Sequence, residues 1–377
     1  NKKYNFEDKF AALLSNTTRS VTREIKDGFV SVPKGCYIQL EKKAAKYILE
    51  NIKSSISSKT GLISRIRTFT EDSGMNLNLV NFYNYYSIKP RQIYNKKITF
   101  GELVRIAFER PQSSDSLSGS AFKILYRLCT IDSPKWLTFL REKLPDVENE
   151  RWDSLNREEQ LMWKMLYVSI WEKPVEIVGF SDILEGIIAF KSNEDIYNEF
   201  LELIEFNYDH ISIIGQSANL SYICPLEAHC TYTRSQILAG LDFLENYTVS
   251  EGVKYLSNID TDVFFTTLNK TNKYYSSRTS YDDYSINENM FHWQSQSTTS
   301  ESSATGKRYR GKNGENGHTL LFVREQKSDE YGPQPFVFLG NVKYMYHRGS
   351  KPMSVVWKMD IPIPAKFIKK TNTLTVG

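Results

Sequence analysis

The first half of the chain carries a helical pattern of hydrophobic positions. Leu40, Ala44, Tyr47, Ile48 and Ile52 recur at spacings of three and four, with charged side chains between them. This spacing gives a helix one apolar stripe and one charged face. We therefore predict a helix over residues 40–52.

Capping residues mark three more helix starts. Thr99 opens TFGELVRIAFER, Ser133 precedes a proline in DSPKWLTFLREKL, and Asn156 stands three residues before Glu159. Ser, Thr and Asn side chains accept hydrogen bonds from the first free backbone N–H groups of a helix, and proline suits its first turn. Residues 1–215 are therefore expected to form a helical domain.

After residue 215 the spacing of hydrophobic positions shortens from that of helices towards that of strands. TYTRSQILAGLDFLENY predicts one more helix, and the β-branched and aromatic runs that follow predict strands. These runs are DVFFTTLNK, HTLLFVREQK, FVFLGNVKYMYH and MSVVWKMDIPIP. Short strands at such spacing favour a twisted or barrel-like sheet. We predict an α+β fold, with the helical domain followed by a mixed β-barrel domain over residues 216–377.

Composition is typical of a globular protein. Of 377 residues, 40% are hydrophobic and 24% charged, enough for two or more domains. The net charge of +4 is small, so affinity for nucleic acid has to come from local patches. No run approaches the roughly 20 apolar residues of a membrane-spanning helix. The chain begins with Asn1 rather than Met, which indicates a piece of a longer protein.

The cysteine pattern and the missing catalytic motifs limit the classes of function expected for this chain. Four scattered cysteines form no disulfide framework, which favours a reducing, cytoplasmic location. No GxxxxGK[ST], HxK or GxSxG motif occurs, so we expect no enzyme activity and no cofactor in this chain itself. Cys224, His229 and Cys230 lack a fourth zinc ligand and the CxxC spacing, so buried thiols are favoured and no metal site is predicted.

The segment SYDDYSINENMFHWQSQSTTSESS combines rings, carboxylates and amides. Its aspartate pair fits a solvated turn, a ligand-binding carboxylate or a metal site. Alternation places Phe291 and Trp293 on one strand face, and both faces carry polar groups as well, which suits a pocket wall. The alternative is a tryptophan packed in the core.

A basic segment, GKRYRGKNGENGH, follows at once. Glycines and cations beside aromatic rings suit contact with a phosphate backbone, although such loops are often merely solvated. A flipped cytosine offers two faces for stacking and an N4 amino donor for a carboxylate. The candidate base-binding residues are Tyr281, Asp282, Asp283, Tyr284, Phe291, Trp293, Ser295, Gln296 and Thr298, and the candidate phosphate-binding residues are Arg278, Lys307, Arg308, Arg310 and Lys312.

Several long strings carry a family resemblance. TSYDDYSINENMFHWQSQSTTSESSATGKRY, LLFVRE, VFLGNVKYMYHRGSKPMSVVWKM and YTRSQILAGL resemble the C-terminal region of SauUSI-like, ATP-dependent type IV restriction enzymes. VPKGCYIQLEKKAAKYILENI carries a weaker resemblance in the helical half.

The resemblance implies a role in antiviral restriction. A phospholipase-D-like nuclease and a superfamily-2 helicase, which use ATP and Mg²⁺, would lie upstream as partners. The helical domain would couple them to a PUA-like or SRA-like reader of double-stranded DNA with 5-methylcytosine or 5-hydroxymethylcytosine. The other hypothesis is an assembly module that dimerises or regulates the motor, with the aromatic region as a protein interface.

Overall fold

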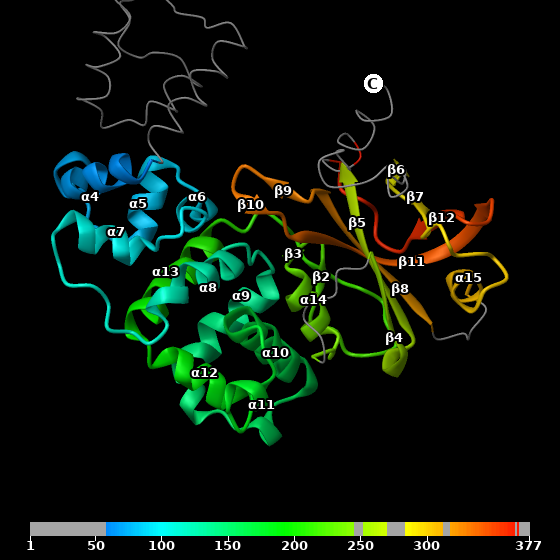
Figure 1. Cartoon of the computed structure of the whole chain (residues 1–377), viewed down its shortest axis with the longest axis horizontal. Coiled ribbons are helices and arrows are strands. Elements are labelled where there is room, and N and C mark those ends of the chain that lie inside the picture. The colour runs from blue at the N-terminus through cyan, green and yellow to red at the C-terminus, as the bar shows by residue number, and fades with distance from the viewer. Residues whose placement is uncertain (1–57, 245–251, 270–282, 312–316, 366–367, 369–377) are drawn as a thin grey trace, which may run out of the picture. The chain divides into compact units, whose positions relative to one another are not determined.

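The structure is a computed structural model that describes residues 58–244, 252–269, 283–311, 317–365 and 368 (Figure 1). The chain folds into two compact units. The first comprises Asn1–Tyr126 and Asn193–Leu203, and the second comprises Arg127–Ser192 and Ile204–Gly377. The helix predicted over residues 40–52 lies outside the described residues. The domain division at residue 215 stays a prediction.

Short helices build the described part of the first unit. They are α4 (Lys59–Ser73), α5 (Leu79–Tyr86), α6 (Pro90–Tyr94), α7 (Phe100–Ala107), most of α8 (Ala121–Leu128) and the first part of α13 (Glu194–Asp209). The predicted start of α7 is confirmed, because Thr99 Oγ1 accepts from the N–H of Glu102, whose carboxylate accepts from the N–H of Thr99. Aromatic residues hold the helices together, with the Phe82 and Phe100 ring centroids 5.4 Å apart.

A buried carboxylate from α13 caps the start of α7. Glu199 Oε1 lies 2.7 Å from the backbone nitrogen of Phe100, and Oε2 lies 2.8 Å from that of Gly101. Burial raises the pKa of Glu199 to about 7, although the two backbone hydrogen bonds oppose the shift. The folded unit therefore binds more protons at this site than the unfolded chain between about pH 4.5 and 7.

This carboxylate makes the stability of the first unit depend on pH. Because the pKa is raised on folding, its stabilising contribution is largest below pH 4.5 and declines as pH rises to about 7. Urea unfolding of the wild type and Glu199→Gln at pH 5 and pH 8 measures this. The wild type is expected to lose stability relative to the variant at the higher pH, and a constant difference would contradict the assignment.

Helices also make up the first half of the second unit. They are α9 (Pro134–Lys143), α10 (Arg157–Trp171), α11 (Val175–Val178), α12 (Ile183–Lys191), the end of α13, and α14 (Arg234–Gly240). The predicted caps are confirmed at Ser133, which accepts from the N–H of Trp136, and at Asn156, which forms a capping box with Glu159. None of the helices in the described residues is long and apolar enough to cross a membrane.

A mixed sheet of eight strands forms the rest of the second unit. Along the sheet the order is β4-β5-β8-β11-β12-β7-β6, with β3 beside β11. Only β5 and β8 run parallel, and the other pairs are antiparallel. The strands are β3 (Thr231–Tyr232), β4 (Val253–Leu256), β5 (Thr261–Asn269), β6 (Tyr284–Asn287), β7 (Met290–Gln294), β8 (His318–Gln326), β11 (Phe336–Arg348) and β12 (Ser354–Met359). All four predicted strand runs are confirmed.

Two small ladders lie outside this sheet. One joins β1 (Gln216–Ser217) to β2 (Glu227–Ala228), and the other joins β9 (Ser328–Asp329) to β10 (Gly332–Pro333).

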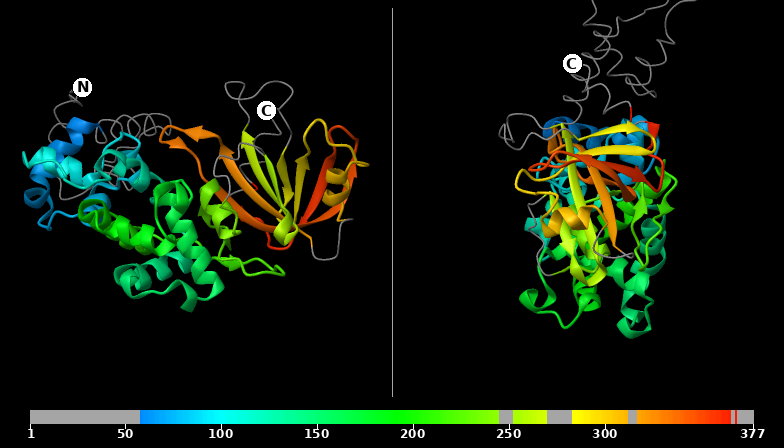
Figure 2. Two further views of the ribbon diagram at one scale, coloured as in Figure 1. Left: turned by 60° about the horizontal axis from the view of Figure 1, so that its bottom comes forward. Right: turned by 90° about the vertical axis from the view of Figure 1, so that its right-hand side faces the viewer.

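The predicted closed barrel is wrong. The four-residue strands β4 and β6 form the two edges of the sheet and do not pair with each other. Figure 2 shows the strands splayed as an open fan. Tyr309, from the short helix α15 (Ala304–Tyr309), packs with sheet residues such as Phe264 and Trp357 in one core cluster. The helix α15 thus contributes a ring to the core of the open sheet.

Candidate functional site

Two of the predicted base-binding residues lie in the core of the sheet. Phe291 is fully buried, and Trp293 is 5% exposed. The Trp293 ring stacks on Phe264 with centroids 4.2 Å apart and meets Tyr309 edge-on at 5.3 Å. Both ring faces of a stacking residue must be reachable by a base, and the Trp293 ring is packed against protein instead. Its burial favours the core interpretation of this tryptophan.

The neighbouring polar candidates form hydrogen bonds with other groups of the protein. Asp283 is buried and accepts from the N–H of Gln294 at 3.0 Å. Ser295 is fully buried and accepts from the N–H of Met353 at 2.9 Å. Gln296 accepts from the Tyr309 hydroxyl at 3.3 Å. These contacts anchor the strand and the loop after it.

The other predicted residues are scattered. Tyr284 is half-buried on β6, and Thr298 is exposed in the loop after β7. Four candidates lie outside the described residues, namely Arg278, Tyr281, Asp282 and Lys312. The structure thus brings together only part of the predicted site, and the base-binding roles stay predictions.

The basic segment splits into different environments. Lys307 is exposed on α15, whereas the half-buried Arg308 forms an ion pair with the buried Asp262, in which Nε lies 2.7 Å from Oδ2. The Arg308 guanidinium also lies over the Tyr255 ring, 4.0 Å from its centroid. Arg310 donates from Nη2 to the backbone oxygen of Glu301 at 2.9 Å.

A cleft of about 610 Å³ opens beside this ion pair. We call it the Asp262 cleft. Its lining combines the carboxylates of Asp260 and Asp262, the cations of Arg308, Arg310 and Lys343, and the rings of Tyr309, Tyr344 and Trp357. His318 and Asn341 add polar groups. Every lining residue belongs to the second compact unit, so this unit alone forms the cleft.

Three buried polar atoms of the lining residues have no partner within the described part of the chain. They are the acceptor Asp262 Oδ1 and two donors, Arg310 Nε and Trp357 Nε1. Asp262 is 2% exposed, and burial raises the pKa of its carboxyl group, an effect that the hydrogen bond and the charge of Arg308 oppose. A buried acceptor without a donor costs free energy, which a donor on a bound molecule recovers.

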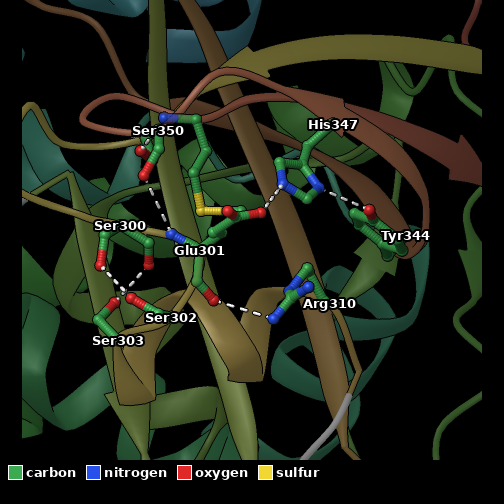
Figure 3. Close-up of polar contacts among 10 residues, drawn as sticks. Ser300, Glu301, Ser302, Ser303, Arg310, Tyr344, His347 and Ser350 are labelled. Atoms are coloured by element: carbon green, nitrogen blue, oxygen red, sulfur yellow. Dashed lines mark hydrogen bonds and ion pairs between the residues drawn. The ribbon is translucent and has the colours of Figure 1, made fainter.

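A chain of hydrogen bonds fixes one side of the cleft (Figure 3). The Tyr344 hydroxyl lies 2.7 Å from His347 Nδ1, and His347 Nε2 lies 3.2 Å from Glu301 Oε2. A histidine with its proton on Nε2 fits both contacts, since it donates to the carboxylate and accepts from the phenol. Through its backbone oxygen, Glu301 also holds Arg310. Two cleft residues, Tyr344 and Arg310, are thereby tied to one loop.

His318, another lining residue of the cleft, is held neutral. Its Nε2 lies 3.1 Å from the backbone nitrogen of Ser221, which can only donate, so this ring nitrogen accepts. Burial lowers the pKa of His318, which agrees with the neutral form. The residue therefore contributes polarity rather than charge to the Asp262 cleft near pH 7.

Two of the residues considered as zinc ligands, His229 and Cys230, lie in contact with other parts of the protein. His229 Nε2 lies 3.1 Å from the backbone oxygen of Pro362, and Cys230 is fully buried. No group of three or more potential metal ligands occurs in the part of the chain that the structure describes.

A comparison with known protein families finds a match, which covers most of the residues that line the cleft. Residues 226–370 match the family model described as Domain of unknown function (DUF3427). The DUF3427 match contains the whole Asp262 cleft except Asn219, Leu220 and Ser221. No curated protein matches the chain. The matched segment begins just before β2, so the helices up to α13 lie outside it.

Proposed function

We propose that this chain is the target-recognition region of a modification-dependent restriction endonuclease and that a flipped, modified cytosine occupies the Asp262 cleft. The nuclease and the ATP-driven helicase would belong to other domains of the same polypeptide. The proposed function is the one expected from the sequence. The base, however, is assigned to the Asp262 cleft and not to the strand that carries Trp293.

The unpartnered carboxylate oxygen of Asp262 carries the proposal. Cytosine presents an N4 amino donor, and a buried carboxylate oxygen accepts such a group. Tyr344, which is half-buried, supplies aromatic surface in the same cleft. Tyr309 and Trp357 line the cleft from the core and are only 1% exposed. Arg308 balances the charge of Asp262. Arg310 and Lys343 add cations that suit the phosphates on either side of a flipped nucleotide.

Cations on and after α15 are expected to contact phosphates without reading the base. Lys307→Glu combined with Arg310→Glu should weaken binding to modified and unmodified duplexes alike, because phosphate contacts carry no sequence information. Each lost contact lowers the slope of log affinity against log salt by about 0.9. Fluorescence anisotropy at several salt concentrations measures both effects.

A matched control uses two exposed lysines of the helical part. Lys96→Glu with Lys173→Glu makes the same change in net charge and should leave the salt slope near that of the wild type. If both double variants lose affinity equally, total charge rather than the cleft governs binding, and the proposed position of the DNA is wrong.

A further inference from the structure

The outer face of β11, β12, β7 and β6 carries a row of four side chains, of which three have rings and one, Val356, is a buried valine. The strand register places Tyr346 opposite Val356, Val356 opposite His292, and His292 opposite Tyr284. Trp357, the next residue on β12, points into the core, and side chains alternate along a strand, so this row lies on the opposite face. Tyr346 is 48% exposed, and the Tyr284 and His292 rings stack with centroids 4.8 Å apart.

Cations flank this row on both sides. In the neighbouring row Lys343 lies directly opposite Lys358, and both are exposed. Like charges at opposed positions destabilise a sheet unless an anion lies near them. Lys343 Nζ lies 3.2 Å from Asp360, whereas Lys358 forms no ion pair with any residue that the structure describes. On the other side Arg348 is exposed.

We propose that this surface binds single-stranded DNA, with bases on the rings and phosphates on the flanking cations. We define the outer aromatic face by Tyr284, His292, Lys343, Tyr346, Arg348 and Lys358. Stacking needs bases whose faces are free, and a duplex hides them. From Tyr346 to Tyr284 the row crosses four strands, about 14 Å at the usual strand spacing. Four-stranded sheets elsewhere stack two or three bases in this way.

The outer aromatic face shares Lys343 with the lining of the Asp262 cleft, and its other residues lie outside that lining. Trp357 lines the cleft and belongs to the core cluster, while Val356 and Lys358 on the same strand point the other way. An unmodified strand of thymidines has no exocyclic amino group for Asp262 to accept from. Binding of this strand therefore reports on the outer aromatic face and not on recognition of an amino group in the Asp262 cleft.

Binding of the full chain to a labelled thymidine strand of about 12 nucleotides tests the proposal. Tyr346→Ala is expected to lower affinity roughly ten-fold, whereas Tyr346→Phe keeps the ring and stays within about two-fold of the wild type. Lys358→Glu should lower both the affinity and the salt slope, by about 0.7 for one phosphate contact on a single strand. Lys173→Glu, an exposed lysine near α11, is the matched control and should bind normally.

Three results would overturn the proposal. These are wild-type affinity in Tyr346→Ala, an equal loss in Lys173→Glu and Lys358→Glu, and no binding of the wild type to the thymidine strand. A wild type that binds duplex but not the single strand removes the outer aromatic face while leaving the Asp262 cleft untouched. Melting temperatures near that of the wild type, expected for exposed side chains, show that each variant is folded.

Discussion

Trp293→Ala is expected to destabilise the second compact unit by about 3–5 kcal/mol, the usual loss for a large core aromatic. Trp293 is 5% exposed and contacts Phe264 and Tyr309, so removing its ring opens a cavity among packed rings. In a unit of this size, such a loss lowers the melting temperature by roughly 6–20 °C. Differential scanning calorimetry of the full chain measures the change.

Tyr346→Ala is the matched control for this loss. It removes an aromatic ring that is 48% exposed, and its melting temperature should stay within a few degrees of the wild type. A Trp293→Ala protein that melts normally but binds modified duplex weakly would return Trp293 to the base pocket and contradict the core assignment.

Breaking the ion pair between Asp262 and the half-buried Arg308 is expected to have the second large effect. Asp262→Val leaves the Arg308 guanidinium, whose side chain is 16% exposed, without its carboxylate. Losing one partner of a buried pair typically costs about 3–5 kcal/mol, whereas replacing both with apolar side chains is often nearly neutral. Asp262→Val with Arg308→Met is therefore expected to recover most of the stability in urea unfolding.

The double variant separates folding from recognition. It lacks the acceptor for the amino group, and a hydrogen bond to a charged group contributes about 1.5–3 kcal/mol, so affinity for modified duplex should fall about ten-fold or more. Thymidine-strand binding by the outer aromatic face should persist. A stable double variant that binds modified duplex as tightly as the wild type would exclude Asp262 as the base contact.

Local chemistry explains which parts of the fold could be predicted. The starts of α7, α9 and α10 follow from Thr99, Ser133 and Asn156, because a capping side chain bonds within three residues of itself. The β-branched runs identified the long strands in the same way. Closure into a barrel depends instead on pairing between the two edge strands β4 and β6, which no local sequence pattern specifies.

The surroundings of the candidate site residues could not be predicted from the sequence for a related reason. Alternation around Trp293 assigns two faces to the strand but does not say which is inside when both carry rings and polar groups. Asp262 lies two positions before Phe264 in a run expected to be a strand, which places a carboxylate on a core face. The carboxylate could therefore have been identified from the sequence. Arg308, the partner of Asp262, is 46 residues away, and only the fold brings the two side chains together.

Recognition of a modified base is best measured by titrating the full chain against matched duplexes that differ only in the modification of one cytosine. We expect about ten-fold or tighter binding to the modified duplex, and still tighter binding when that cytosine is mispaired, since flipping then costs less. Equal affinity for modified and unmodified duplexes, paired or mispaired, would contradict recognition of a modified base by this chain.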